Sequence, residues 1–473
     1  MKKYDFAVVG NGIASMVAAT ELANSGNTVV MFNPSSNWGS YFSGINLGGR
    51  KFDLGMNLLE ISSHDPRGDE VSSYLASVRN DVGRFCNIIG AYIGSLIEIV
   101  ETEIPKCLYE GKVHPDMVLA NRLDLLNSLS DQLKSAIIAD LKNCLRDFSK
   151  DSTLHARNKL ANFGKFASIS YRDASVANHG AAFHRLFVEP ACQRILAIAS
   201  DSMSALLHRV AWLPLYYPET LISQFENGET MLPVTRFHYP KKGSFSEISA
   251  TLFQRVQRNP GIDVSHAAIT RISSVGTSWQ FNGGICAAHL VWGQNRGQLS
   301  ALLGVHDDSD NYTKISVHIA FATIDASSFV QRFSTIFILD SDSPIYRITD
   351  QTWAGGQFEA PQANCTIEME AEFFSKWESE DNLILHSKIA AELFRIGIIV
   401  ESGGLNIHSV RRFKDAIVSP TASNRCMAIA QYAKLNGEYP NIELIGPAAP
   451  FGATSFNDYI IQGLRLGNLH RKK

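Results

Sequence analysis

The N-terminal residues follow a pattern of two apolar runs separated by a helical stretch. Residues 6–9 form the first run and residues 28–32 form the second. Between them, Gly10-Asn11-Gly12 leads into a stretch with helical spacing that ends at Gly26. Short unbroken apolar runs are typical of strands buried on both faces. The pattern therefore predicts a strand, a glycine-rich turn, a helix and a second strand, which is the opening βαβ unit of a dinucleotide-binding fold.

The residues of the predicted turn suit a phosphate site. Gly10 permits a tight turn, and Gly12 leaves room for a pyrophosphate against the backbone. The amides of Ile13 and Ala14 begin the helix, where they would face phosphates with the positive end of the helix dipole. Ser15 stands where a third glycine is usual and is small enough for helix–strand packing. From this motif alone, a glycine turn that binds nothing is the alternative.

The residue after the second run departs from the usual pattern. An acidic side chain normally follows that strand and holds the adenosine ribose hydroxyls. This chain has Asn33. Because an amide bonds a hydroxyl without the strength of a charged group, we expect weaker or unusual nucleotide binding.

Residues 70–149 have helical periodicity, with apolar side chains at positions such as Phe85, Ile89 and Ile93. The longest apolar stretch, residues 86–100, is shorter than the roughly twenty residues that span a bilayer. It predicts a buried helix and no integral membrane segment. No histidine, cysteine or acidic residues have the spacing of a metal site.

The second half of the chain contains alternating patterns. Residues 315–321 and 365–369 alternate strictly between apolar and polar, which predicts half-buried antiparallel strands with more strand within residues 333–350. Near the C-terminus an apolar strand reaches Gly446. A small-residue loop and a helix that begins at residues 455–458 follow it.

Composition narrows the possible classes. The chain has 473 residues, 45% of them hydrophobic and 19% charged, enough for a large core and two or three lobes. A net charge of -3 gives no sign of nucleic-acid binding. The seven cysteines are scattered without a Cys-x-x-Cys, which predicts reduced thiols in a cytoplasmic protein. The first strand begins close to Met1, so no signal peptide is expected. Nothing in the sequence indicates an oligomeric state.

Further motifs follow the glycine turn in a fixed order. The small-residue pair Gly39-Ser40 is followed by Phe52-Asp53-Leu54-Gly55, by a Phe-x-x-Pro element within residues 169–221, and by the C-terminal segment 441–469. In this order the chain resembles the flavin amine oxidase superfamily. That group includes protoporphyrinogen oxidases, phytoene desaturases and, more distantly, UDP-galactopyranose mutases.

The resemblance implies that the cofactor is FAD. In such proteins the small-residue pair lies against the FAD pyrophosphate, which here implicates Gly39 and Ser40. The segment after Asp-x-Gly passes beside the flavin ring, which implicates Gly55, Met56 and Asn57.

The resemblance also implicates residues from the rest of the chain. Ile269 would offer backbone hydrogen bonds to the adenine, and Gly446 would approach the pyrophosphate. Phe456, Asn457 and Asp458 would begin a helix directed at the pyrimidine edge of the flavin. The expected cofactor-binding residues are therefore Gly10, Gly12, Ile13, Ala14, Ser15, Asn33, Gly39, Ser40, Gly55, Met56, Asn57, Ile269, Gly446, Phe456, Asn457 and Asp458.

The expected fold is a two-lobed α/β structure. A discontinuous, Rossmann-like FAD-binding domain would comprise residues 1–69, 240–304 and 425–473. A substrate domain of helices and an antiparallel sheet would comprise residues 70–239 and 305–424.

The function implied by the resemblance is that of an FAD-dependent oxidoreductase. It would remove hydride from a C–N or C–C bond of a small organic substrate. The sequence does not identify catalytic residues, but Asn57, Tyr217 and Arg347 are candidates for the substrate pocket. For Tyr217 simple packing is the alternative, and for Arg347 a solvated surface position.

Two other functions stay open within the same resemblance. One is a non-redox flavoprotein of the sugar-mutase type, which predicts a basic diphosphate site. The other is a binding protein without flavin, similar to Rab escort and GDP-dissociation-inhibitor proteins. Asn33 and Tyr41, which replace charged residues usual in the family, are the kind of loss expected in such a protein.

Overall fold

The computed structural model describes most of the chain. The described residues are 2–35, 37–61, 82–120, 122–159, 161–208, 213–228, 236–241, 243–308, 311–340, 342–370, 382–401, 403–439, 441–449 and 455–472, without the side chains of residues 82–87. Part of the predicted helical stretch, residues 70–81, lies outside them.

The first sheet contains the predicted βαβ unit. Its strands are β1 (Lys2–Val9), β2 (Val29–Phe32), β10 (Ile262–Ser265), β11 (Ile272–Val275), β12 (Ser278–Phe281), β13 (Ile285–Trp292) and β19 (Ile442–Leu444). β1 lies between β2 and β13, and all three are parallel. β10 and β19 add further parallel strands, whereas β11 and β12 close one edge as antiparallel strands. Every residue of β2 is buried, as its unbroken apolar sequence predicts.

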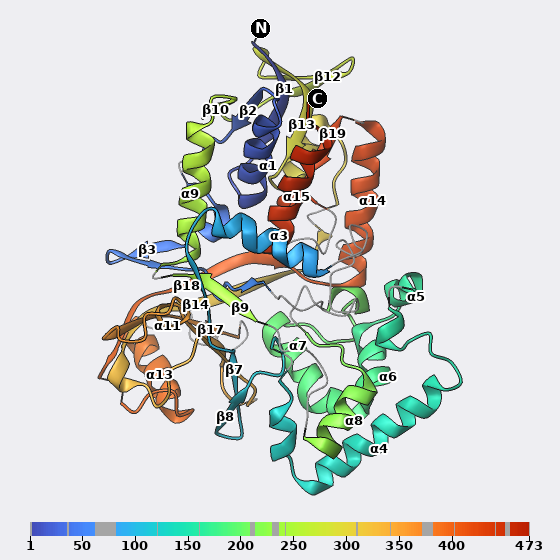
Figure 1. The fold of residues 1–473 in the computed structure, drawn as a ribbon, viewed down its shortest axis with the longest axis vertical. Coiled ribbons are helices and arrows are strands. Elements are labelled where there is room, and N and C mark those ends of the chain that lie inside the picture. The colour runs from blue at the N-terminus through green and yellow to red at the C-terminus, as the bar shows by residue number, and fades with distance from the viewer. Residues whose placement is uncertain are drawn as a thin grey trace.

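Four helices accompany this sheet in the upper part of Figure 1. They are α1 (Ile13–Asn24), α9 (Phe245–Arg258), α14 (Ala422–Glu438) and α15 (Phe456–Leu469). α15 packs closely on α1 because two glycines four residues apart face it. A Cβ atom on Gly463 would lie 2.5 Å from Val17, and one on Gly467 would lie 2.6 Å from Glu21. The first and last helices are therefore in backbone-to-backbone contact.

The second sheet crosses the middle and lower left of Figure 1. In spatial order its strands are β18 (Leu405–Val418), β14 (Lys314–Asp325), β17 (Gln362–Met369), β16 (Ile345–Asp350), β15 (Thr335–Ile338), β7 (Lys106–Tyr109) and β8 (Lys112–Pro115). The predicted strands are confirmed, but β14 is not half-buried. Its residues 318–324 are buried on both faces, because a second apolar layer that includes α13 (Asn382–Arg395) covers the far side.

The prediction of helix in residues 82–149, interrupted only by a loop at residues 114–116, is wrong for its central part. Helix α3 (Val82–Gly94) ends before the short strand β6 (Ile99–Glu101), and β7 and β8 follow. β7 is parallel to β15, whose residues come much later in the chain. A long-range pairing of this kind overrides the local helical spacing.

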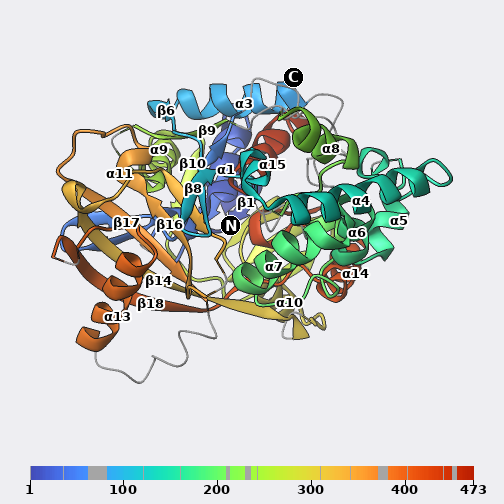
Figure 2. The same cartoon turned by 90° about the horizontal axis from the view of Figure 1, so that it is seen from below.

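The remaining helices gather at the lower right of Figure 1 and on one side in Figure 2. They are α4 (Asp131–Phe148), α5 (Phe163–Ser168), α6 (Tyr171–Phe183), α7 (Glu189–Leu196) and α8 (Pro218–Asn227), and α4 packs against α6 and α8. In this layer burial lowers the pKa of His179 to about 3. The neutral ring accepts a hydrogen bond from the Tyr216 amide at 2.7 Å, which is a structural role.

Smaller elements connect the two large sheets. They are the hairpin β3 (Ile45–Leu47) and β4 (Arg50–Phe52), the three-stranded sheet of β5 (Leu59–Glu60), β9 (Phe237–Pro240) and β6, and the helices α10 (Arg296–Leu303) and α11 (Gln351–Ala354). Every helix among the described residues is too short or too polar to cross a lipid bilayer. The six cysteines in the described part of the chain whose side chains are placed are free thiols.

The contact between α1 and α15 leads to a test of stability. We expect Gly463→Ala to lower the free energy of unfolding by about 2 kcal/mol, because the new methyl group overpacks the helix interface. Gly437→Ala is the matched control, since Gly437 lies in α14 and a methyl group there would point into open space. Its effect should be below about 1 kcal/mol and stabilising. Equal effects in chemical denaturation would contradict the close packing.

Candidate functional site

Three glycines from distant segments meet at the carboxyl ends of β1, β13 and β19. Gly10 has a φ of +133°, and a Cβ atom there would lie 2.7 Å from the Ser15 hydroxyl and 3.1 Å from the Gly293 backbone. Gly446 has a φ of +57°, and its Cβ would lie 3.5 Å from the Gly293 carbonyl and 3.6 Å from Ala14. The three residues form a buried glycine cluster, in which backbones meet without side chains between them. The carboxyl ends of parallel strands are where open α/β sheets bind nucleotides.

The N-terminus of α1 lies at this glycine cluster. Gly12 is its N-cap, no side chain caps the helix, and its first turn holds no acidic residue. Ile13 and Ala14 are buried, so the first amides of the helix lie away from bulk water. Uncapped amides at the positive end of a helix form an anion site.

Buried polar atoms near the glycine cluster lack hydrogen-bond partners among the described residues. The Ser15 hydroxyl and the Asn33 side-chain nitrogen are two of them. Asn33 is fully buried, and its side-chain oxygen accepts a hydrogen bond from the Ser35 amide at 3.0 Å. The Asn33 Nδ2 group therefore remains available to donate to a hydroxyl oxygen.

The predicted small-residue pair, Gly39-Ser40, lies next to the glycine turn. The Gly39 amide donates to the Asn11 carbonyl at 2.7 Å, which holds the pair against the glycine turn. Gly39 has a φ of +103°, and a Cβ atom there would collide with the Ser249 hydroxyl of α9. Ser40 also has a positive φ, of 52°. The next residue, Tyr41, donates its hydroxyl to the Leu54 carbonyl.

Side chains of α11 and of the second sheet hold the backbone of residues 51–56. The Gln351 amide accepts from the Asp53 N–H at 3.0 Å and donates to the Lys51 carbonyl at 2.7 Å. Glu368 accepts from the Met56 N–H at 3.1 Å. Gly55 has a φ of +82°, and a Cβ atom there would lie 3.1 Å from the Glu368 carboxylate. The Asp-x-Gly segment is thus fixed from across the boundary between the two sheets.

Asp53 connects this segment to α9. Its carboxyl accepts a hydrogen bond from the Tyr239 hydroxyl and another from the Phe245 amide at 3.1 Å. Burial raises the pKa of Asp53 to about 7, although these bonds and Asn57 favour the charged form. The carboxyl therefore changes its charge near neutral pH.

Arg347 is not a solvated surface residue. Its guanidinium forms a two-point contact with Glu368 through Nε at 2.8 Å and Nη2 at 2.6 Å. Tyr346 donates its hydroxyl to the same carboxylate at 3.1 Å. The surface alternative for Arg347 is wrong, because the facing strand supplies a buried acid.

The last helix begins with a capping box, as Ser455 and Asp458 bond each other's backbone amides. Asn457 donates to the Glu60 carbonyl at 3.0 Å, and Phe456 packs edge-on against Phe42 at 4.9 Å. Burial raises the pKa of Asp458 to about 6. Its Oδ1 has no hydrogen-bond partner in the part of the chain that the structure describes.

Two further predicted site residues make packing contacts. Ile269 packs against the apolar cluster that contains Phe32, the last residue of β2. Tyr217 is buried at the start of α8, with His155 at 5.4 Å and Arg157 at 5.2 Å from its ring. The contacts of Tyr217 are those of packing.

Four residues of the site were not predicted. Gly293 follows β13 and could have been found, because a glycine directly after a buried strand marks the end of a nucleotide-binding strand. Gln351, Glu368 and Tyr239 have no local signal, since each acts on a segment far away in the chain.

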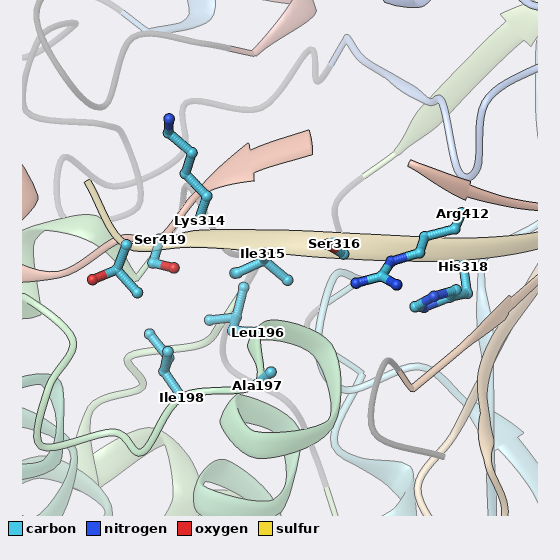
Figure 3. Close-up of a pocket in the computed structure, with 10 residues that line it drawn as sticks. Leu196, Ala197, Ile198, Lys314, Ile315, Ser316, His318, Arg412 and Ser419 are labelled. Carbon is cyan, nitrogen blue, oxygen red and sulfur yellow. The ribbon is translucent and has the colours of Figure 1, made fainter. Parts of the chain in front are cut away.

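A cavity of about 220 Å³ lies elsewhere, at the start of β14. In Figure 3, Leu196 and Ala197 lie below the strand, while His318 and Arg412 lie side by side at one end. No residue predicted for cofactor or substrate binding is among its described lining residues. Within the described residues, no group of three or more His, Cys, Asp or Glu is placed to hold a metal ion.

Comparison with known proteins agrees with this architecture. Residues 8–75 match the family model of the NAD(P)-binding Rossmann-like domain, and no match was found among curated proteins. Reduced UDP-galactopyranose mutase is 11% identical, with 98% of this chain and 95% of that chain covered and a TM-score of 0.68. A provisionally assigned protoporphyrinogen oxidase from Exiguobacterium sp. 255-15 is 15% identical, with 99% and 98% covered and a TM-score of 0.65.

Cyclohexylamine oxidase from Brevibacterium oxydans IH-35A is also similar, at 12% identity, with 99% and 98% covered and a TM-score of 0.59. Such identities establish the fold only. The chain has the two-lobed α/β fold of these solved structures, with a Rossmann-like unit near its N-terminus. The resemblance predicted from the sequence is confirmed at this level.

The raised pKa of Asp53 predicts a pH-dependent stability. The folded-state pKa of about 7 exceeds the ordinary value of 3.8, so the contribution of this carboxyl is full at low pH and is lost as the pH rises through 7. Relative to Asp53→Asn, the wild type should lose about 2 to 3 kcal/mol of unfolding free energy between pH 5 and pH 8. Denaturant titrations at several pH values measure this, with the exposed Asp415→Asn as control. Parallel pH profiles for wild type and Asp53→Asn would show that the buried carboxyl is not neutral at pH 5.

Proposed function

We propose that the chain is an FAD-dependent oxidoreductase that acts on a small organic substrate. The observation that carries the proposal is the meeting of Gly10, Gly293 and Gly446 at the uncapped start of α1. Bound FAD would supply hydride-accepting chemistry toward a C–N or C–C bond. The proposed FAD-binding domain comprises residues 1–69, 240–304 and 425–473, and the proposed substrate domain comprises residues 70–239 and 305–424.

The hydrogen-bonding groups around the glycine cluster fit a dinucleotide. The amides of Ile13 and Ala14 suit a pyrophosphate, since they are backbone donors at a helix N-terminus. The unpartnered Asn33 Nδ2 suits a ribose hydroxyl, and Gly39 and Ser40 complete the rim. Oδ1 of Asp458 also has no hydrogen-bond partner among the described residues, and it suits a hydroxyl donor of the ligand.

Residues 55–57 would hold the reactive part of the cofactor. Gly55 is buried without a side chain of its own, and Met56 and Asn57 are buried beside it. Bonds from Glu368 and Gln351 to this stretch and its neighbours fix its position without a mobile loop. A rigid backbone beside the reacting centre keeps cofactor and substrate correctly oriented. This orientation is the main contribution of the protein in cofactor chemistry.

The sugar-mutase alternative is less well supported. It requires basic side chains available to bind a diphosphate. Arg347, the basic residue predicted for the substrate pocket, is neutralised by Glu368.

The simplest test is the colour of the purified protein. We expect a yellow protein with the paired near-ultraviolet and blue absorbance bands of an oxidised flavin. A colourless protein that takes up no added FAD would contradict the proposal and favour the flavin-free binding protein. If the protein is yellow, aerobic bleaching by candidate amines separates an oxidase from a mutase.

The role of Asn33 gives a quantitative prediction. Asn33→Leu removes the buried donor and should weaken FAD binding about tenfold, since one such hydrogen bond contributes about 1 to 2 kcal/mol. Asn33→Asp keeps an acceptor for the Ser35 amide and should bind FAD at least as tightly as wild type, because a carboxylate strengthens bonds from ribose hydroxyls. Fluorescence titration of the apoprotein with FAD measures both. Equal affinity of wild type and Asn33→Leu would exclude Asn33 from the ribose site.

A further inference from the structure

Glu368 forms a fully satisfied buried carboxylate at the boundary between the two sheets. Its side chain lies on β17 and is 2% exposed. Oε1 accepts the Met56 N–H at 3.1 Å and Arg347 Nε at 2.8 Å. Oε2 accepts Arg347 Nη2 at 2.6 Å and the Tyr346 hydroxyl at 3.1 Å. The bond from the Met56 N–H ties the carboxylate to the backbone between β4 and β5. The other three bonds, from Arg347 and Tyr346, hold the carboxylate in place.

The fit between this carboxylate and residues 55–56 is close. Arg347 and Glu368 are direct partners in the pairing of β16 with β17, so the ion pair has no freedom to move along the sheet. A Cβ atom at position 55 would lie 3.1 to 3.3 Å from the three terminal atoms of Glu368. The glycine therefore leaves room for the carboxylate, and the carboxylate in turn fixes the peptide that follows the glycine.

We propose that Glu368 is a positioning residue of the proposed cofactor site. It holds the Gly55–Met56 backbone beside the place where the flavin ring would bind. Arg347 and Tyr346 act through Glu368 and do not bind substrate. The proposal rests on the proposed function, because the role of residues 55–57 beside a flavin belongs to it.

Stability alone does not account for such an arrangement. Replacement of a buried ion pair by apolar residues of similar size is often neutral or stabilising, whereas removal of one partner is costly. What an apolar pair cannot supply is a directed acceptor for the Met56 N–H. The carboxylate therefore contributes position to the segment more than it contributes free energy to the fold.

The test compares Glu368→Gln with Glu370→Gln. Glu370 lies two residues further along and also pairs with an arginine, Arg194, at 2.5 Å, but it does not contact residues 51–57 in the structure. In Glu368→Gln we expect about tenfold faster hydrogen–deuterium exchange in the peptide of residues 52–59 and about tenfold weaker FAD binding, because a bond to a charged group is lost. In Glu370→Gln both values should stay within about twofold of wild type.

The double variant Arg347→Met/Glu368→Leu separates position from folding. We expect its melting temperature to stay near that of the wild type, while the peptide of residues 52–59 still exchanges about tenfold faster and FAD still binds more weakly. If the double variant restores slow exchange and FAD affinity together with stability, the role of the pair is structural only and the proposal is wrong.

Two further outcomes separate this proposal from the proposed function. If the wild type takes up no FAD, the proposed function fails, yet the exchange measurement still decides whether Glu368 holds the segment. If FAD binds and Arg347→Met raises the KM of a substrate while Glu368→Gln changes neither exchange nor FAD affinity, Arg347 acts on the substrate directly and the positioning role is excluded.

Discussion

The architecture depends on three backbones that approach one another without side chains between them. Gly10 ends β1, Gly293 ends β13, and Gly446 follows β19. A methyl group on Gly10 or Gly293 would collide with the Ser15 hydroxyl, so the small residue at the start of α1 is part of the same constraint. This close approach places backbone amides and carbonyls, and no side chains, at the carboxyl edge of the sheet. The other features of the site surround it.

Buried polar side chains close to the site hold the segment of residues 51–56. Gln351 of α11 and Glu368 of β17 bond its backbone, and Tyr41 reaches the Leu54 carbonyl from the first lobe. Directed bonds specify one relative placement, whereas apolar contacts tolerate sliding. Buried acids accompany this arrangement, and desolvation raises the pKa of Asp53, Asp350 and Asp458. The boundary is therefore well determined in geometry and sensitive to charge.

The sequence was sufficient where the determining interactions are local. The βαβ unit follows from two apolar runs and a glycine turn, and the cap at Ser455 follows from its position before the last helix. The strands β7 and β8 were missed because their partner β15 lies far along the chain. Likewise, Gln351 and Glu368 act on residues 298 and 312 positions away. No pattern around either residue distinguishes it from an ordinary polar residue on a strand or turn.

The contact between α1 and α15 has a consequence for the order of folding. Residues 13–24 pair with residues 456–469, so their helix gains its closest partner only after more than four hundred further residues have been made. Contacts between residues so far apart form slowly, because loop closure costs entropy before any contact forms. The first apolar strands are synthesised well before β19 and α15 can pack with them, and apolar surface exposed in that interval promotes aggregation. Gly10, Gly293 and Gly446 meet only after β19 has formed, so a chain that is cut short before Gly446 has an incomplete candidate site.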